Sequence, residues 1–293
     1  MLNKSLAVGI IFFLVVSCLP YSILSNEMST SMFDGNILYV GGSGHGNYSK
    51  IQDAIDNASG GDTVFVYSGT YYENVDVDKS IDLVGEDRNS TIIDGQNKYS
   101  VISVVAGSVL IEKFTIRNGS YGVDGWYWNV IISGNIIVNN DLGIIVTESD
   151  NYNITGNIIT ENNYGISFYA VSNSSIKYNL IMLNKEIGIK LTWSAFYGSY
   201  YNSVYYNTIQ KNKKGIYLDM SGFNKINYNN FYQNIRDASI SMDTSNSWNN
   251  NYWDRPRILP KPIIGWGLLW IFPFINFDWH PAKEPYDISI PEM

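Results

Sequence analysis

The stretch VIISGNIIVNNDLGIIVTESDN (residues 130–151) is followed at once by YNITGNIITENNYGISFYAVSN (residues 152–173), and the two match along their length. Asn falls on Asn, Ile on Ile and Gly on Gly at a spacing of 22 residues. A period of this size indicates a solenoid, in which each copy forms one coil that stacks on the next. The fold is therefore decided by what one such unit forms.

One asparagine in each unit sets the register. The spacings between these anchors are 22, 22, 28, 22 and 22 residues, and a second asparagine follows each of the first five after five residues. The anchors are Asn135, Asn157, Asn179, Asn207, Asn229 and Asn251. Because apolar residues stand three positions before and two positions after each anchor, the pattern predicts columns of like side chains.

The apolar residues are mostly β-branched and alternate with polar residues in short runs such as ITGNIIT and YGISFYA. This alternation is strand periodicity, whereas a leucine-rich repeat would show a leucine ladder and a helical half. Three short strands with tight bends account for one unit. The sequence therefore predicts an all-β fold, a parallel β-helix with about 22 residues per coil and coils ~4.8 Å apart.

Asparagine suits such a frame for two reasons. It tolerates the positive φ that a bend often needs, and its amide can bond to an identical amide in the next coil. We therefore interpret the anchors as a structural ladder. The longer step holds six extra residues, which we place in TWSAFYGSYYN (Thr192–Asn202) as a loop projecting from one face.

Both ends of a β-helix expose an unpaired strand edge and need a cover. At the N-terminal end Ser49 and Gln52 have the spacing of a capping box, and apolar residues follow at helical spacing up to Gly60. At the other end residues 255–293, rich in proline and aromatics, are predicted to form a C-terminal cap. The alternative is a membrane-interface patch of Trp266, Trp270 and Trp279.

Residues 1–25 resemble a secretory signal peptide, because Lys4 precedes an apolar run that ends in small and polar residues. Retention as a membrane anchor is the alternative. Cys18, the only cysteine, lies in this leader or is a lipidation site. We assign residues 26–36 to a linker and residues 37–254 to the β-helix with its N-terminal cap.

The composition limits the partners. Charged residues are only 16% of the chain and the formal net charge is −8, which argues against nucleic-acid binding. We expect membrane contact only through the N-terminal segment. Nothing in the sequence predicts a bound cofactor. Without a cysteine after the leader, the exported protein depends on its core and backbone hydrogen bonds.

Residues 49–95, SKIQDAIDNASGGDTVFVYSGTYYENVDVDKSIDLVGEDRNSTIIDG, resemble the opening of many right-handed parallel β-helix proteins, including pectin methylesterases. The GNxI…N…GI units are similar to the NosD-type repeat, common in exported proteins and named after a copper-site maturation factor. This resemblance covers residues 37 to about 254. It implies a right-handed parallel β-helix of the pectin-lyase-like superfamily, and the matched frame residues imply no particular activity.

The paired-aspartate motifs that this resemblance would imply for pectin methylesterases or polygalacturonases are missing from the sequence. The register leaves Glu148 and Asp150 as adjacent carboxylates on one flank, able to act as acid and base or to bind calcium, unless they are only a solvated pair. Copper prefers imidazole or sulfur ligands, and His45, His280, and the pair Met220 and Met242 are too few to predict a metal site.

Aromatic residues share the same flank as these carboxylates. The candidates for carbohydrate binding are Trp126, Tyr127, Trp128, Tyr169, Trp193 and Tyr197. Flat rings bind sugars by stacking, although a packed aromatic shell around the loop is the alternative.

These features predict an exported cell-surface module that binds glycans or envelope polymers without catalysis. A polysaccharide lyase or glycoside hydrolase using the flank carboxylates is the second hypothesis. A structural or adhesive envelope protein, or a NosD-like copper-site accessory protein, is the third.

Overall fold

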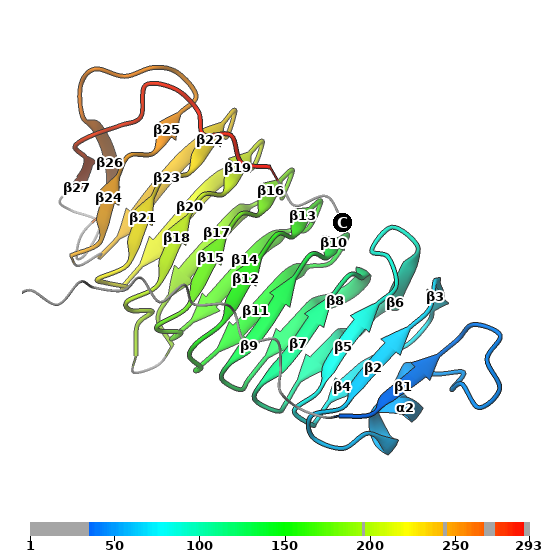
Figure 1. The fold of residues 1–293 in the computed structure, drawn as a ribbon. Coiled ribbons are helices and arrows are strands. Elements are labelled where there is room, and N and C mark those ends of the chain that lie inside the picture. The colour runs from blue at the N-terminus through cyan, green and yellow to red at the C-terminus, as the bar shows by residue number, and fades with distance from the viewer. Residues whose placement is uncertain (1–34, 195–196, 243–244, 267–272, 290–293) are drawn as a thin grey trace, which may run out of the picture. The chain divides into compact units, whose positions relative to one another are not determined.

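The computed structural model describes residues 35–194, 197–242, 245–266 and 273–289 (Figure 1). About ten coils of roughly 22 residues follow one another, and the strands of the regular coils pair in parallel with their equivalents in the next coil. The predicted all-β parallel β-helix is therefore confirmed. The predicted leader, with Cys18, lies outside the described residues.

The strands form three stacks, named here the first, second and third faces in the order in which a coil visits them. The first face holds β1 (Ile37–Val40), β2 (Thr63–Val66), β5 (Asp82–Gly85), β7 (Val109–Glu112), β9 (Val130–Ser133), β12 (Asn153–Thr155), β15 (Ser175–Lys177), β18 (Ser203–Tyr205), β21 (Lys225–Asn227) and β24 (Ser247–Asn249). The second holds β3 (Gly69–Tyr71), β10 (Ile136–Val138), β13 (Ile158–Thr160), β16 (Leu180–Met182), β19 (Thr208–Gln210), β22 (Asn230–Tyr232) and β25 (Tyr252–Trp253). The third holds β4 (Val75–Val77), β11 (Leu142–Thr147), β14 (Tyr164–Tyr169), β17 (Ile187–Thr192), β20 (Lys214–Asp219), β23 (Arg236–Ser241) and β26 (Lys261–Trp266). Two longer strands, β6 (Thr91–Val104) and β8 (Thr115–Gly125), run from the second face onto the third.

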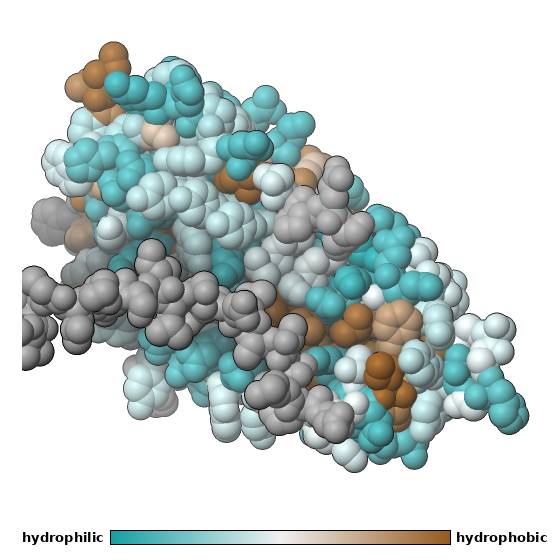
Figure 2. Space-filling view, viewed as in Figure 1, coloured by the Kyte–Doolittle hydropathy of each residue, from teal (hydrophilic) through white to brown (hydrophobic). Residues whose placement is uncertain are grey.

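Apolar side chains point inward from all three faces and stack in columns. Ile132, Ile154 and Ile176 are register partners in β9, β12 and β15, and each is fully buried. Burying one such side chain contributes ~1.5–3 kcal/mol, so the repeated columns supply much of the stability. The predicted columns are confirmed, and hydrophilic residues cover most of the surface seen in Figure 2.

The anchor asparagines form the predicted ladder at the bend between the first and second faces. Asn157 shows the pattern, because its Oδ1 accepts from the backbone N–H and the side-chain amide of Asn135 at 2.9 and 3.1 Å. Its Nδ2 donates to Asn179 Oδ1 at 3.0 Å and to two backbone carbonyl oxygens. Each buried amide is thus satisfied by its neighbours, as burial requires.

The positive φ of this bend falls on the residue before each anchor and not on the anchor. Gly134 and Gly156 adopt it in two units, but Tyr178, Tyr206 and Tyr228 adopt it in the next three. The expectation that the asparagines themselves are left-handed is wrong, because the bend is made one residue earlier. The three tyrosine rings stack with centroids 5.5 and 5.3 Å apart, which offsets a strain of about 1–2 kcal/mol per residue.

Two more polar columns run along the other bends. The second asparagines of the units line the bend between the second and third faces, where Asn140 and Asn162 repeat the ladder geometry. A third column lies where the chain returns to the first face. The sequence analysis missed it, because a tyrosine and a serine take the place of asparagine in the first two coils of the column. Its members are Tyr152, Ser174, Asn202, Asn224 and Asn246.

The register locates the six extra residues of the long step. Ile166 pairs with Ile189 and Ile189 pairs with Ile216, so these two steps are 23 and 27 residues instead of 22. Five of the six extra residues therefore lie in the predicted loop, and the sixth lies in the bend after Asn184. Placing all six in Thr192–Asn202 was wrong by one residue, because that bend is one residue wider than its equivalents.

A short helix, α2 (Ile51–Asn57), lies at the N-terminal end and buries Ile51, Ala54 and Ile55 in the core. The predicted capping box is wrong, because the helix begins after Lys50 and Ser49 makes no capping bond. The carboxylate of Glu73 instead accepts the first two helical N–H groups, those of Ile51 and Gln52, at 3.0 and 3.1 Å.

At the other end β26 and β27 (Pro273–Asp278) form an antiparallel hairpin. β26 pairs with β23 on the third face, and Asp278 of β27 pairs with Trp248 of β24 on the first face. The buried Asp278 carboxylate accepts N–H bonds from the backbone and side chain of Asn251 and from the Trp253 indole, at 2.9–3.1 Å. It therefore terminates the anchor ladder. Trp270 of the predicted interface patch lies outside the described residues.

Candidate functional site

The candidate residues from the sequence gather at the bend between the third face and the first face of the next coil. Backbone bonds run there from Ser108 N–H to Trp128 oxygen, from Asn129 to Asp150, from Asn151 to Ser172 and from Asn173 to Tyr200. We name this bend the aromatic corner. It comprises residues 126–128, 148–150, 170–172 and the described residues of the insertion loop, 193–194 and 197–201. Successive coils thus bring Trp128, Asp150, Ser172 and Tyr200 into one row.

The aromatic side chains of this corner are exposed on both sides of the carboxylates. Trp126 and Trp128 are 51% and 60% exposed, with Tyr127 tilted against Trp128 at a centroid distance of 5.5 Å. On the far side Trp193 and Tyr197 are 41% and 70% exposed. Exposed flat rings of this kind retain free faces for a ligand.

A hollow of about 340 Å³ lies in this corner, next to Tyr197. Its lining includes Glu148, Asp150, Ser172, Tyr197 and Tyr200. The Glu148 carboxylate accepts a hydrogen bond from Ser194 Oγ at 2.6 Å, and Asp150 Oδ1 accepts from the Ser172 backbone at 3.1 Å. Both carboxylates are therefore oriented by residues of later coils. They can accept further hydrogen bonds from hydroxyl groups in the hollow.

Tyr169 differs from the other aromatic candidates. Its backbone oxygen accepts from Glu148 N–H, so it borders the corner. Its side chain is half-buried on the third face, where Lys190 Nζ lies 4.7 Å from the ring centroid and donates to the hydroxyl at 3.1 Å. One face of this ring is therefore already covered.

Sequence reasoning missed a buried carboxyl beneath the corner, that of Asp124 at the end of β8. Asp124 is 8% exposed, and its Oδ2 accepts from Ser100 Oγ at 3.1 Å. Burial raises the pKa of Asp124, although the Trp126 and Ser100 side chains favour its ionised form. Asp124 lies at an outward strand position paired with Ile145, and the sequence carries no signal that such an outward aspartate is buried.

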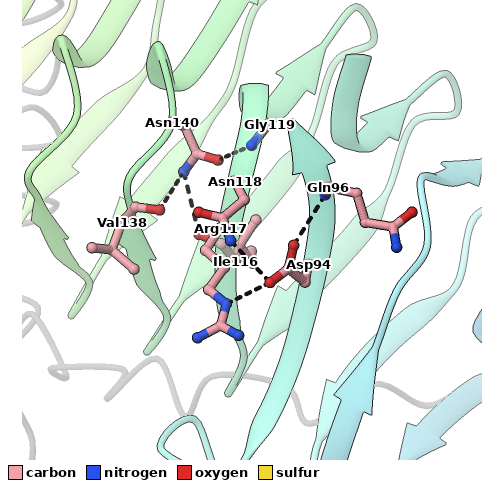
Figure 3. A network of polar contacts seen from close by, with 8 residues as sticks. All are labelled: Asp94, Gln96, Ile116, Arg117, Asn118, Gly119, Val138 and Asn140. Atoms are coloured by element: carbon pink, nitrogen blue, oxygen red, sulfur yellow. Dashed lines mark hydrogen bonds and ion pairs between the residues drawn. The ribbon is translucent and has the colours of Figure 1, made fainter. Parts of the chain in front are cut away.

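A second hollow, of about 540 Å³, lies at the bend between the second and third faces. Its lining is polar and includes Asn97, Asp141, Glu161 and Lys185. Nearby, Arg117 and Asn118 donate to Asp94 Oδ2 at 2.8 and 2.9 Å, and the Gln96 backbone donates to Oδ1 (Figure 3). These bonds hold the loop that carries Asn97 beside the hollow. None of the site residues predicted from the sequence lines this second hollow.

The described residues do not fit a copper site. Within them no group of three or more His, Cys, Asp or Glu side chains comes together. His45 is exposed before α2, and His280 Nδ1 lies 3.0 Å from Asn249 Oδ1. Met220 and Met242 follow the paired residues Asp219 and Ser241 in adjacent coils, and two thioethers alone are a poor ligand set.

In the described part of the chain no helix is long and apolar enough to cross a membrane. No curated protein sequence matches this chain.

Solved structures resemble the chain in fold. A complex of XylC with xylose matches with a TM-score of 0.62 and 11% identity, over 74% of this chain and 65% of that one. ORF18 of Geobacillus virus E2 matches with a TM-score of 0.48 and 16% identity, over 74% and 57%. The A-module of the Azotobacter vinelandii mannuronan C-5 epimerase AlgE4 matches with a TM-score of 0.43 and 15% identity, over 74% and 83%. This chain thus spans less than two thirds of the first two proteins.

The sequence itself gives the family. Residues 55–270 match the family model described as periplasmic copper-binding protein (NosD). Because this match covers most of the chain, the protein belongs to the NosD family.

Proposed function

We propose that this protein is exported and binds a glycan polymer along the aromatic corner without cleaving it. The observation that carries the proposal is a pair of exposed aromatic groups, Trp126–Trp128 and Trp193 with Tyr197, on the same bend as a hollow that includes Glu148 and Asp150 in its lining. Rings can stack on the apolar faces of sugars, while Glu148 and Asp150 accept hydrogen bonds from sugar hydroxyls.

The arrangement favours a polymer over a single sugar. Trp128, Asp150, Ser172 and Tyr200 belong to four successive coils, so the row extends over three inter-coil steps. At ~4.8 Å per step this is a strip of roughly 14 Å. A ligand that contacts both aromatic groups must therefore span several sugar units.

The charge of the corner favours a neutral glycan. Glu148 and Asp150 both line the hollow, and the whole chain has a formal net charge of −8. A polyuronate would meet like charges there, which weakens association at low ionic strength. We therefore assign neutral polysaccharides as the ligand class.

Export is supported by the family, whose description is periplasmic. The signal peptide predicted for residues 1–25 belongs to this proposal. The copper in the family description has no fitting ligand group among the described residues, so the proposal does not involve it.

The test is binding of the purified protein to soluble xylan and dextran, with alginate and polygalacturonate as acidic comparisons. We expect a neutral polymer to bind and Trp128→Ala to weaken this binding about tenfold or more, as for an aromatic side chain that the ligand covers. Tyr99→Ala is the matched control, because Tyr99 is 85% exposed and lies outside the aromatic corner. Equal binding by Trp128→Ala and the wild type would refute the proposal.

A second candidate function, polysaccharide cleavage, rests on the hollow that brings Glu148 and Asp150 together. Two neighbouring carboxylates are the minimum set for glycoside hydrolysis. The test is release of reducing ends or unsaturated products from the same four polymers. Activity that disappears in Glu148→Gln, with binding retained, would establish this function in place of simple binding.

A further inference from the structure

A third hollow, of about 300 Å³, lies on the first face beside the stacked rings of Tyr178, Tyr206 and Tyr228. It lies over β18 and β21. Its lining is Ser203, Tyr205, Tyr206, Lys225, Asn227 and Tyr228. We name this hollow, together with the tyrosine stack and Lys177, the first-face site. It shares no lining residue with the hollow of the aromatic corner.

The three stacked tyrosines occupy a backbone position that disfavours them. Their φ angles are 54°, 52° and 59°, in the left-handed region that costs a bulky residue about 1–2 kcal/mol. Gly134 and Gly156 hold the same position in two earlier coils without this cost. The two stacked ring pairs return only about 0.5–1.5 kcal/mol each. Because strained residues cluster at ligand sites, the stack points to a role beyond stability.

The C-terminal segment supports the tyrosine stack from the second-face side. Tyr286 packs edge-on against Tyr206 and Tyr228, with ring centroids 5.9 and 5.8 Å apart. Its backbone N–H donates to Asn230 Oδ1 at 3.0 Å, and its hydroxyl donates to the Asn250 carbonyl oxygen at 2.7 Å. Because Asn230 begins β22 on the second face, the stack is held on that side while it lines the hollow on the first face.

The first face is positively charged at these coils, although the formal net charge of the chain is −8. The strands β15, β18, β21 and β24 with their flanking bends contain two lysines and no Asp or Glu. These strands and bends are residues 173–179, 201–207, 223–229 and 245–251.

The two lysines of this surface are Lys177 and Lys225. Lys225 is exposed and lines the hollow, and Lys177 is the register partner of Tyr205. Neither ammonium belongs to an ion pair among the described residues. The first-face site therefore attracts an anionic ligand, whereas the carboxylates of the aromatic corner repel one.

The polar groups of the hollow suit the hydroxyls of a sugar. Asn227 Oδ1 is buried and has no hydrogen-bond partner among the described residues, so it is an unused acceptor. Ser203 and the tyrosines carry hydroxyl groups that both donate and accept. Single-stranded nucleic acid, another anionic polymer, binds by stacking its bases on open ring faces. The tyrosine rings here lie 3° and 14° from parallel and cover one another, so a glycan fits this wall better.

We propose that the first-face site binds a glycan that carries anionic groups, either carboxylate or sulfate. Lys225 and Lys177 pair with those groups, and the tyrosine stack forms one wall of the site. This site is separate from the aromatic corner, and it does not rest on the function proposed for that corner.

The test is binding of the purified protein to alginate, which carries carboxylates, and to dextran sulfate, which carries sulfate esters. Dextran is the neutral match of dextran sulfate. We expect at least one acidic polymer to bind, and the binding to weaken as the salt concentration rises. Lys225→Gln should weaken it about fivefold or more, because a charge-assisted contact is lost. Lys211→Gln is the matched control, because it removes the same charge from an exposed site at the bend between the second and third faces.

Tyr206→Gly tests the tyrosine wall. It gives this bend the residue found at Gly134 and Gly156, so the coil keeps its shape while the ring is lost. Binding of the acidic polymer should fall about tenfold. A melting curve shows whether the variant folds, and if it does not, Lys225→Gln decides the question.

The two sites are distinguished by crossed measurements. Trp128→Ala should keep the wild-type affinity for the acidic polymer, and Lys225→Gln should keep any affinity for a neutral one. If neither acidic polymer binds, or if Lys225→Gln binds as tightly as the wild type, the inference is overturned while the proposed function of the aromatic corner is unaffected.

Discussion

The Ser194 hydroxyl donates a 2.6 Å hydrogen bond to the Glu148 carboxylate, although 46 residues separate the two in sequence. Thr147, beside Glu148, pairs with Tyr169, and Tyr169 pairs with Thr192, so the bond crosses an intervening coil. It ties the insertion loop to a regular bend of the β-helix. The insertion loop thereby supplies part of the lining of the hollow, including Tyr197, which a regular coil lacks.

We predict that Ser194→Ala weakens glycan binding about three- to tenfold with little change in thermal stability. The lost bond is exposed and contributes little to folding, but it positions the loop that carries Tyr197. Isothermal titration calorimetry and a melting curve measure the two effects. Ser120→Ala removes a similar exposed bond at the other bend, and it should leave both quantities unchanged.

The fold was predictable because each coil repeats the same pattern of buried and exposed positions. Ile132, Ile154 and Ile176 had to be buried columns, since a period of 22 residues with strand alternation leaves them no other position. The third polar column was predictable only in part. Asn202, Asn224 and Asn246 repeat at 22 residues. Tyr152 and Ser174 precede them at the same position, and only the hydrogen bonds from Tyr152 N–H to Ser174 Oγ and from Ser174 N–H to Asn202 Oδ1 show that these two belong to the column.

The position of the candidate site on the fold was predictable in part for the same reason. Register placed Trp128 and Asp150 on one flank, and the structure puts them in adjacent coils of one bend. Asp124 was not predictable, because its burial depends on how the bend folds over an outward strand position. The sequence cannot distinguish this aspartate from a solvated one.

We predict that Glu73→Ala destabilises the N-terminal cap by about 1–2 kcal/mol, whereas Ser49→Ala has no measurable effect. Glu73 accepts the N–H groups of Ile51 and Gln52, while Ser49 makes no capping bond. Urea unfolding of both variants measures the difference. A larger loss for Ser49→Ala would restore the capping box and refute the assignment of Glu73.

We predict that Asn179→Ala costs about 2–5 kcal/mol of unfolding free energy, because it leaves several buried partners unsatisfied. The Asn179 side chain bonds to Asn207, to the backbone and amide of Asn157, and to two carbonyl oxygens. Asn163→Ala is the matched control. Its side chain makes a single exposed bond, to Asp141, so its loss should cost less than about 1 kcal/mol. Equal losses would mean that the ladder adds no stability beyond an ordinary surface bond.

We predict that Asp94→Asn is destabilising at neutral pH and that the difference from the wild type shrinks on acidification. Burial raises the pKa of Asp94, but the hydrogen bonds from Gln96, Arg117 and Asn118 outweigh burial and hold its pKa below the usual value. Such a group stabilises the fold fully above the unfolded pKa of about 3.9, and this stabilisation is lost as the pH falls through the folded pKa. The loss in Asp94→Asn should be about 1.5–3 kcal/mol at pH 7, the usual range for hydrogen bonds to a charged group. Urea unfolding at several pH values between 7 and about 2.5 measures the difference. A difference that stays constant across this range would show that the charge of Asp94 does not matter.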